Sequence, residues 1–250
     1  MAGRTIGEVK TVISFENVSY SYEKGRPAVR NVSFRIQDGE AVGLIGANGA
    51  GKSTLMKLLL GLVQGQGRIT VDGVTVESTN LPQVRRSLGC VLQNSDNQMF
   101  MPTVYEDMMF GPLNAMVPRE EAERQVDEVL SALDITALKH RHNHRLSGGE
   151  KRMAAIATVL AMNPAAVLMD EPTSALDPYY RRVVIRAIGN MEQTKLIAAH
   201  DLDMIWDTCQ RVILLDGGEI VADGPKETVL RDKKLLEQHH MELPLRFQNV

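Results

Sequence analysis

The chain has 250 residues, of which 44% are hydrophobic and 24% charged, the balance of a globular protein rather than a disordered one. Its 28 basic and 31 acidic residues give a net charge of −3, so no overall positive charge indicates nucleic-acid binding. Cys90 and Cys209 match no metal-binding spacing, and no apolar run approaches the roughly 18 residues of a membrane-spanning helix. We therefore expect no disulfide scaffold, no secretion signal and no membrane span.

The first 45 residues are typical of β structure. Apolar and polar residues partly alternate over residues 12–18 and 28–36, on either side of the turn-prone residues 24–27. Residues 41–45 form a short apolar run, which is typical of a strand buried on both faces of a parallel sheet. A helical pattern over residues 55–60 follows, so this stretch predicts a strand–loop–helix unit.

Helices and strands alternate along the rest of the chain. Apolar residues recur at helical spacing through much of residues 103–163. The last helix of this stretch is expected to begin near Ser147 and to end before Pro164. Further strands are predicted at residues 166–170, 194–199 and 211–215, with helices between them. The tail after Asp232 is polar and is expected to be a terminal helix. This alternation predicts an α/β architecture with mostly parallel strands.

Residues 46–53, Gly-Ala-Asn-Gly-Ala-Gly-Lys-Ser, fit the phosphate-loop pattern G-x-x-x-x-G-K-[ST] between a predicted strand and a helix. Glycines let backbone N–H groups converge on phosphate, and the following helix adds its free N-terminal amides. Lys52 is placed to reach the β- and γ-phosphates, and the Ser53 hydroxyl to bind Mg²⁺. The predicted nucleotide contacts in this loop are Asn48, Gly49, Ala50, Gly51, Lys52, Ser53 and Thr54.

Asp170 and Glu171 close the apolar strand predicted at residues 166–170. Side chains alternate along a strand, so the two carboxylates are expected to have different roles. Asp170 is placed to hold Mg²⁺, and Glu171 to polarise a water in line with the γ-phosphate. Standing alone, the pair would be two solvated carboxylates, but the preceding phosphate loop favours the catalytic interpretation.

Residues 146–150, Leu-Ser-Gly-Gly-Glu, form a second helix N-terminus that carries a hydroxyl and two glycines. Alone, this segment would be an N-cap and loop, but here it resembles the signature of ATP-binding cassette (ABC) ATPases. The other family motifs follow in order: Gln93 resembles the Q-loop glutamine, residues 174–177 the D-loop, and His200 the switch histidine. Tyr22 is similar to the aromatic residue that stacks on adenine, although a strand aromatic could also simply pack on its neighbours.

The resemblance covers residues 12 to about 225. It implies a phosphate-loop NTPase of the ABC type, with a mostly parallel core sheet, an N-terminal antiparallel β subdomain and an inserted α-helical subdomain. We expect a single ABC ATPase domain over residues 1–250. Its expected parts are the core with the β subdomain at 1–92 and 164–230, the helical signature subdomain at 93–163, and a C-terminal tail at 231–250.

The resemblance also implies an ATPase mechanism that needs ATP and Mg²⁺. Two such cassettes pair head to tail, as a homodimer or with a paralogous ATPase subunit, and ATP holds them together until hydrolysis opens the pair. The implied catalytic residues are Glu171, His200 and Gln93, and the implied Mg²⁺ ligands are Ser53, Gln93 and Asp170. The second chain would contact the nucleotide through Ser147, Gly148, Gly149 and Asp177.

Residues 93–114 resemble the pattern of energy-coupling-factor transporters for cobalt, nickel and vitamins. Six apolar side chains near Gln93 suit the docking, near residues 93–112, of a short helix from an integral membrane coupling subunit. They could equally be the core of the helical subdomain, but we expect Phe100 or Met101 to stay partly exposed. The six residues are Met99, Phe100, Met101, Met108, Met109 and Phe110.

The transported substrate stays open between cobalt or nickel, which we favour, and a vitamin such as biotin. The resemblance further implies a separate substrate-binding membrane subunit, a peripheral location on the cytoplasmic face of the cell membrane, and no nucleic-acid partner. For His239 and His240 we expect a solvated tail rather than a metal-binding pair, because adjacent helical residues point about 100° apart. A soluble ABC ATPase acting on ribosomes, iron–sulfur assembly or DNA ends is disfavoured, since the chain has one cassette and no heptads between Lys52 and Asp170.

Overall fold

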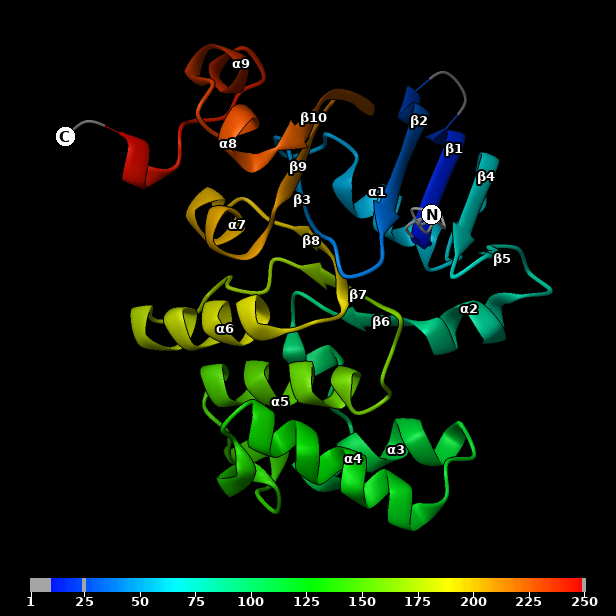
Figure 1. Cartoon of the computed structure of the whole chain (residues 1–250), viewed down its shortest axis with the longest axis vertical. Helices are drawn as coiled ribbons and strands as arrows, with labels where there is room; N and C mark the ends of the chain where they lie inside the picture. The colour runs from blue at the N-terminus through cyan, green and yellow to red at the C-terminus, as the bar shows by residue number, and fades with distance from the viewer. Residues whose placement is uncertain (1–9, 24–25, 249–250) are drawn as a thin grey trace, which may run out of the picture.

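The structure is a computed structural model that describes residues 10–23 and 26–248. Residues 24 and 25 of the predicted turn lie outside this described part. Two β-sheets share the upper part of the molecule, and a group of helices lies below the larger sheet (Figure 1). The fold therefore has the predicted α/β core, β subdomain and helical insertion.

The N-terminal sheet is antiparallel, with strand order β2-β1-β4-β5. Its strands are β1 (Thr11–Glu23), β2 (Arg26–Gln37), β4 (Gln66–Val71) and β5 (Val74–Thr75). Phe15 and Phe34 face each other across β1 and β2, with stacked rings 4.6 Å apart. The two predicted strands lie within β1 and β2, but β1 runs on to Glu23 through several shifts of register. This irregular extension carries Tyr22.

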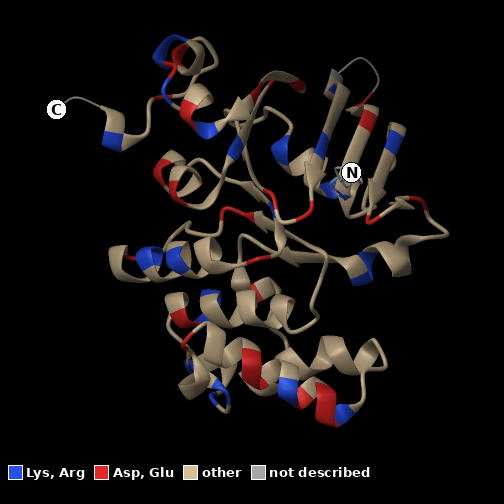
Figure 2. Cartoon of the chain, viewed as in Figure 1, with Lys and Arg blue, Asp and Glu red and all other residues tan. Residues whose placement is uncertain are grey.

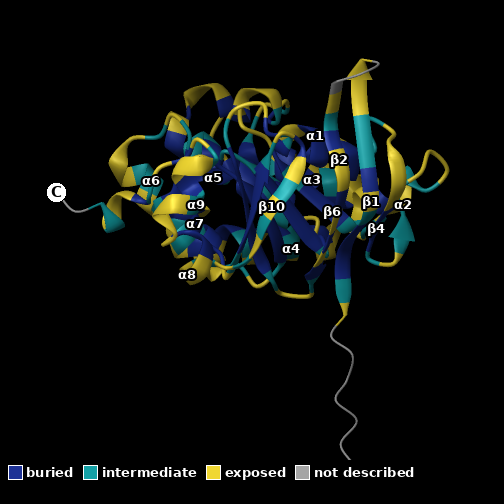
Figure 3. Ribbon diagram, turned by 90° about the horizontal axis from the view of Figure 1, so that it is seen from above, coloured by how far each residue is buried: buried dark blue, intermediate teal, exposed yellow. Residues whose placement is uncertain are grey.

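The larger sheet has strand order β10-β9-β3-β8-β7-β6 and is parallel from β9 to β6, with β10 antiparallel at the edge. Every residue of β3 and β8 is buried. For β3 this agrees with its unbroken apolar sequence, whereas β8 also buries the polar Thr194 and Lys195. Figure 3 shows these strands as the dark, buried centre of the molecule. The strands are β3 (Ala41–Ile45), β6 (Leu88–Val91), β7 (Ala166–Asp170), β8 (Thr194–Ala198), β9 (Arg211–Asp216) and β10 (Glu219–Pro225).

Helix α1 packs in the apolar core that the two sheets share, through Leu55, Leu58 and Leu59. The helices that connect or flank the strands are α1 (Lys52–Leu59), α2 (Leu81–Ser87), α6 (Pro178–Asn190), α7 (Leu202–Thr208) and α8 (Lys226–Val229). In open α/β sheets, binding sites lie at the carboxyl ends of the strands. The loops after β3, β6, β7 and β8 meet at that edge.

The helical insertion consists of α3 (Val104–Asn114), α4 (Arg119–Ala132) and α5 (Gly148–Leu160). Helix α5 is buried along Met153, Ile156 and their neighbours, and α4 contributes Val126 and Leu130 to the same core. Helix α4 carries both acidic and basic residues (Figure 2). Among residues 10–23 and 26–248, none of the helices combines the length and apolar character needed to cross a membrane.

The C-terminal tail contains α9 (Lys233–Gln238) and a short 3₁₀ turn at Leu245–Phe247. The expectation of a solvated tail is confirmed for His240, which is exposed, but it is wrong for Leu236, which is fully buried, and for Met241, which is 9% exposed. His239 Nδ1 lies 2.9 Å from Asp216 Oδ2, so this histidine pairs with a carboxylate of β9. The tail's few apolar residues therefore pack it onto the domain despite its polar composition.

Candidate active site

The loop between β3 and α1 has the tight curvature that its glycines predict. Gly51 has a φ of +112°, and a Cβ there would lie 2.7 Å from the carbonyl oxygen of Ala28. Gly49 has a φ of +82°, and none of the described residues comes within 4 Å of where its Cβ would stand. Only a glycine fits at position 51. The backbone at Gly49 instead borders open space that a ligand can approach.

Lys52 lies inside the loop that precedes it and is 8% exposed. Its Nζ donates to the carbonyl oxygens of Gly46 and Ala47 and lies 3.4 Å from Nε2 of His200. Burial lowers the pKa of Lys52, and the nearby carboxylates of Glu171 and Asp170 oppose this effect. The site thus contains a cation held mainly by neutral carbonyl oxygens.

Asp170 ends β7, and Glu171 follows in the left-handed region with a φ of +47°. The N–H of Glu171 donates to the carbonyl of Ala198 at 2.8 Å, so the turn is fixed against the end of β8. Glu171 Oε1 lies 3.6 Å from His200 Nε2. Burial raises the pKa of both carboxyl groups, while His200 and Lys52 act in the opposite direction. The local backbone turn thus gives the two carboxylates separate positions.

These groups line one cavity of about 600 Å³. It gathers residues from β1, the phosphate loop, the end of β6, the end of β7 and the end of β8. The predicted site residues in its lining are Tyr22, Asn48, Gly49, Ala50, Gly51, Lys52, Ser53, Thr54, Gln93, Asp170, Glu171 and His200. Ala28 and Ser174 also line it. Nothing in the sequence singled out Ala28, a small residue within a strand.

Tyr22 stands at the mouth of this cavity and is 54% exposed. Its hydroxyl lies 3.4 Å from Thr54 Oγ1, and its ring meets that of Tyr20 edge-on at 4.9 Å. Lys57 Nζ lies 5.6 Å from the centroid of the ring and donates to the Tyr22 hydroxyl at 3.4 Å. Tyr20 and Lys57 therefore support the ring while much of it stays accessible.

The four remaining predicted residues are not among the described residues that line the cavity: Ser147, Gly148, Gly149 and Asp177. Ser147 caps α5 in a reciprocal capping box with Glu150. Asp177 caps α6 by accepting hydrogen bonds from the N–H groups of Tyr179 and Tyr180. Within one chain these two residues therefore have structural roles as helix caps.

The two signature glycines differ in their surroundings. A Cβ on Gly149 would come within 1.9 Å of Tyr180 Cγ, so this glycine lets α5 pack closely on α6. A Cβ on Gly148 would meet no atom of the described residues within 4 Å. Packing within the chain thus accounts for Gly149 and leaves Gly148 unexplained.

Arg152 was not found from the sequence, where it lies in an apolar helical stretch. It is 4% exposed and donates to the carbonyl oxygens of Leu92 and Gln93, at the end of β6. Burial lowers its pKa. Its Nε has no hydrogen-bond partner within the described part of the chain. The arginine ties α5, which begins at the signature, to the backbone of Gln93.

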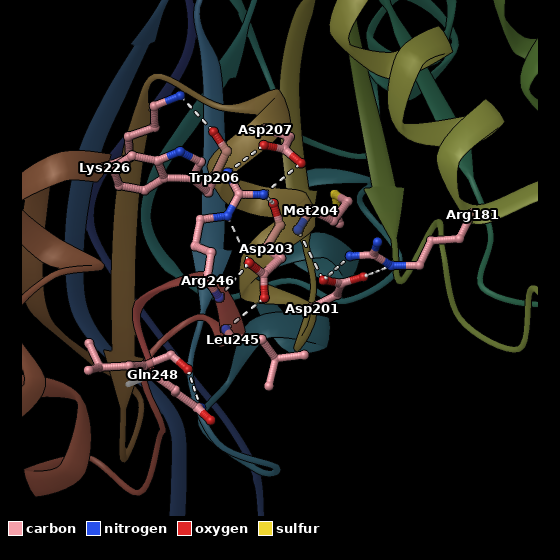
Figure 4. A network of polar contacts seen from close by, with 11 residues as sticks. Arg181, Asp201, Asp203, Met204, Trp206, Asp207, Lys226, Leu245, Arg246 and Gln248 are labelled. Carbon is pink, nitrogen blue, oxygen red and sulfur yellow. Dashed lines mark hydrogen bonds and ion pairs between the residues drawn. The ribbon is translucent and has the colours of Figure 1, made fainter. Parts of the chain in front are cut away.

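The helix that follows His200 is held on both sides (Figure 4). Asp201 caps α7 and receives a bidentate ion pair from Arg181 of α6 with two contacts of 2.7 Å. From the tail, Arg246 Nε donates to Asp203 at 2.8 Å. Neither arginine was predicted, because their partners lie far away in the sequence. Together they fix the position of α7 behind His200.

Three of the six apolar residues near Gln93 belong to the core of the helical subdomain, since Met99, Met108 and Met109 are at most 8% exposed. Phe100 is 65% exposed and Phe110 41%, and their rings pack edge-to-face at 4.8 Å. The expectation that Phe100 or Met101 is partly exposed is therefore confirmed. We call Phe100, Met101 and Phe110 the apolar docking surface.

The comparisons with known proteins agree with this geometry. The sequence pattern of the ABC transporter family matches residues 29–174. The energy-coupling factor transporter ATP-binding protein EcfA of Methanothermobacter thermautotrophicus is 39% identical, over 93% of this chain and 77% of that protein. EcfA of Carboxydothermus hydrogenoformans is 37% identical, over 93% of this chain and 87% of that protein.

Among solved structures, CbiO1 of Clostridium perfringens, part of the ABC transporter complex CbiONQ, is 32% identical with a TM-score of 0.83. The similarity covers 92% of this chain and 94% of that chain. The family pattern matches more than half of the chain and includes both the phosphate loop and the acidic end of β7. The chain therefore belongs to the ABC transporter family and is an ATPase of that family.

Proposed function

We propose that this chain is the ATP-hydrolysing subunit of an energy-coupling-factor importer, and that ATP binds in the 600 Å³ cavity. The observation that carries the proposal is the convergence of Lys52, Asp170, Glu171 and His200 behind a glycine loop open at Gly49. Lys52 would exchange the carbonyls of Gly46 and Ala47 for phosphate oxygens. Tyr22, half exposed at the mouth, would stack on the adenine.

The residues of the cavity fit Mg²⁺ together with ATP. Ser53, Gln93 and Asp170 offer a hydroxyl, an amide and a carboxylate oxygen, which are the donors that Mg²⁺ prefers. When bound, the ion would neutralise charge on the phosphates. Glu171 would orient and polarise the attacking water. His200, whose Nε2 lies 3.6 Å from the Glu171 carboxylate, would hold that carboxylate in place.

The pH dependence of hydrolysis offers a first test. Glu171 can act as a base only when ionised, and burial raises the pKa of its carboxyl group. We therefore expect kcat to fall as the pH drops through this raised pKa, at a higher pH than the roughly 4.3 of an ordinary glutamate. The measurement is kcat at saturating ATP across pH. If kcat falls only at or below the pKa of an ordinary glutamate, the carboxyl group of Glu171 does not have the buried environment described here.

The signature residues are proposed to act on the nucleotide of a second cassette, which is either a second copy of this chain or a paralogous subunit. Ser147 and Gly148 are exposed, and Gly148 has free space around it. Such a surface suits the approach of a phosphate at the N-terminus of α5. Asp177 would approach the same nucleotide from its place before α6.

The two signature glycines provide a matched pair of variants. Gly149→Ala should destabilise the chain by about 1–3 kcal/mol because its methyl overlaps the ring of Tyr180. Gly148→Ala should leave the free energy of unfolding nearly unchanged yet lower ATPase activity, because its methyl faces the second cassette. Urea unfolding and steady-state ATPase assays measure both. Full activity in Gly148→Ala would argue against a nucleotide at this surface.

The proposed membrane partners are an integral coupling subunit, which would place a short helix on the apolar docking surface, and a substrate-binding subunit. The similarity to EcfA proteins and to CbiO1 of the CbiONQ complex supports this assignment. A groove of about 300 Å³ beside the surface, between Met109 and Leu113, suits an apolar side chain of that helix. The chain would then lie on the cytoplasmic face of the membrane. For the substrate we propose cobalt or nickel ions, with a vitamin such as biotin as the alternative.

Purification from detergent extract tests the proposal. We expect integral membrane proteins to copurify with the chain, and the reconstituted complex to take up Co²⁺ or Ni²⁺ when ATP is supplied. Uptake of biotin instead would favour the vitamin alternative. Recovery of ribosomal or DNA-repair proteins without any membrane protein would overturn the transporter assignment. A complex carrying Glu171→Gln serves as the transport-inactive control.

A further inference from the structure

Asp107 of α3 is a buried carboxylate outside the nucleotide cavity, and it is only 1% exposed. Its Oδ1 accepts hydrogen bonds from the N–H groups of Phe100 and Met101, both at 3.1 Å. Its Oδ2 accepts from Nδ2 of Asn143. One carboxylate therefore holds the backbone of the apolar docking surface and a side chain from a segment 36 residues away.

Asn143 is attached to the same loop at further points. Its Nδ2 also donates to the carbonyl of Met101 at 2.6 Å, and its backbone N–H donates to the carbonyl of Pro102 at 3.0 Å. Its Oδ1 has no hydrogen-bond partner in residues 10–23 and 26–248. Turning the amide over would place that oxygen against two acceptors, so the observed orientation is the one that can bond.

The pair links two surfaces for which separate roles are proposed above. On one side, Phe100 is 65% exposed on the docking surface. On the other side, Asn143 begins the 3₁₀ turn Asn143–Arg145 that leads through the buried Leu146 to Ser147. The N–H of Val104 also donates to the carbonyl of Arg141, so the two segments run side by side. A shift of the docking surface must therefore shift the approach to Ser147, or break these bonds.

We propose that Asp107 and Asn143 are positioning residues that carry movement from the docking surface to the signature at Ser147. A buried carboxylate bonded to three donors tolerates little stretching, so the two segments move as one body. In this way, engagement of the membrane subunit at Phe100 and Met101 would set the position of Ser147 against the nucleotide of the second cassette. The inference rests on the proposed docking site and extends it to a residue-level connection.

The chain offers well-matched variants. Asp107→Asn keeps shape and the acceptor for Phe100 and Met101, but it turns an N–H₂ group toward the N–H₂ group of Asn143. Asn143→Ala removes the same bond from the other side, and with it the bond from the Asn143 amide to the carbonyl of Met101. Thr103→Ala is the control, because Thr103 caps α3 in the same stretch of chain and its side chain makes no bond to Asp107 or Asn143 in the described structure. Thr103→Ala should lower the urea midpoint of unfolding but leave the hydrogen bond between Asp107 and Asn143 in place.

The experiment is hydrogen exchange, read by mass spectrometry, on the chain alone and in the complex that copurifies with its membrane subunits. In the wild-type protein, we expect the complex to slow exchange in residues 97–113 and also to change exchange in residues 143–150. In Asp107→Asn and Asn143→Ala the first effect should persist and the second should disappear. Thr103→Ala should keep both effects.

Kinetics supply a second measurement on the same variants. In the complex with the membrane subunits, kcat for ATP hydrolysis should fall by about tenfold in either single variant. KM for ATP should stay unchanged, because the phosphate loop still holds the nucleotide and only the approach of Ser147 is misplaced. The double variant should be no slower than Asn143→Ala, since that single variant already removes the bond between the two side chains. If the complex still changes hydrogen exchange at residues 143–150 in both variants, the inference is overturned but the docking site is not. Absence of protection at residues 97–113 in the wild-type complex would overturn the docking site and the inference together.

Discussion

Replacing Glu171 by Gln should abolish ATP turnover while leaving ATP binding intact. The variant keeps the size of the side chain and its place 3.6 Å from His200, but it loses the charge that polarises the attacking water. Loss of a general base typically costs about 10²- to 10⁴-fold in rate. Because Lys52 and the glycine loop are unchanged, the affinity for ATP should stay close to that of the wild-type protein.

The same substitution should favour a closed pair of cassettes. If ATP holds the two subunits together and only hydrolysis removes the γ-phosphate contacts, a chain that cannot hydrolyse ATP should accumulate as a dimer. Size-exclusion chromatography with Mg-ATP measures this, and Glu128→Gln on the exposed face of α4 is the control. Undiminished hydrolysis in Glu171→Gln would mean that another residue positions the water.

The parts of the site that lie close together in the sequence could be predicted from it. The phosphate loop, Lys52 and Ser53 form one strand–loop–helix unit, so their geometry follows from local chemistry. Asp170 ends β7, and His200 follows the neighbouring parallel strand β8; the carboxyl ends of such strands share one edge of the sheet. For these residues, local pattern and sheet topology together determine the location.

The connections between segments could not be predicted in this way. Arg152 donates to backbone carbonyls. Because every residue has such a carbonyl, the sequence does not indicate which residues Arg152 bonds to. Asp107 and Asn143 pair across 36 positions, and each alone reads as an ordinary polar residue of a helix and a loop. The tail packs onto α7 through Arg246 although its composition is polar. Long-range pairing depends on the folded arrangement, and a single sequence does not reveal it.

Replacing Lys52 by Ala should weaken ATP binding itself, by about tenfold to a hundredfold, the value expected for a lost hydrogen bond to a charged group. The structure also predicts a second effect. Because burial lowers the pKa of Lys52, its charged form is disfavoured in the folded chain without nucleotide. Removing it nevertheless leaves the carbonyls of Gly46 and Ala47 without these hydrogen bonds, so the variant should also lose about 1–3 kcal/mol of stability in the absence of ATP. Calorimetry with Mg-ATP and urea unfolding without nucleotide measure the two effects.

Lys195 provides the matched control for this argument. It is 4% exposed, burial lowers its pKa, and its Nζ donates to backbone carbonyls, those of Ile188 and Met191 at the end of α6. Lys195→Ala leaves these carbonyls unpaired and should destabilise the chain by about 1–3 kcal/mol, while ATP affinity stays at the wild-type value. Both buried lysines should therefore affect stability, but only Lys52 should also affect the affinity for ATP. Equal ATP affinity in Lys52→Ala and the wild-type protein would mean that the glycine loop does not hold phosphate.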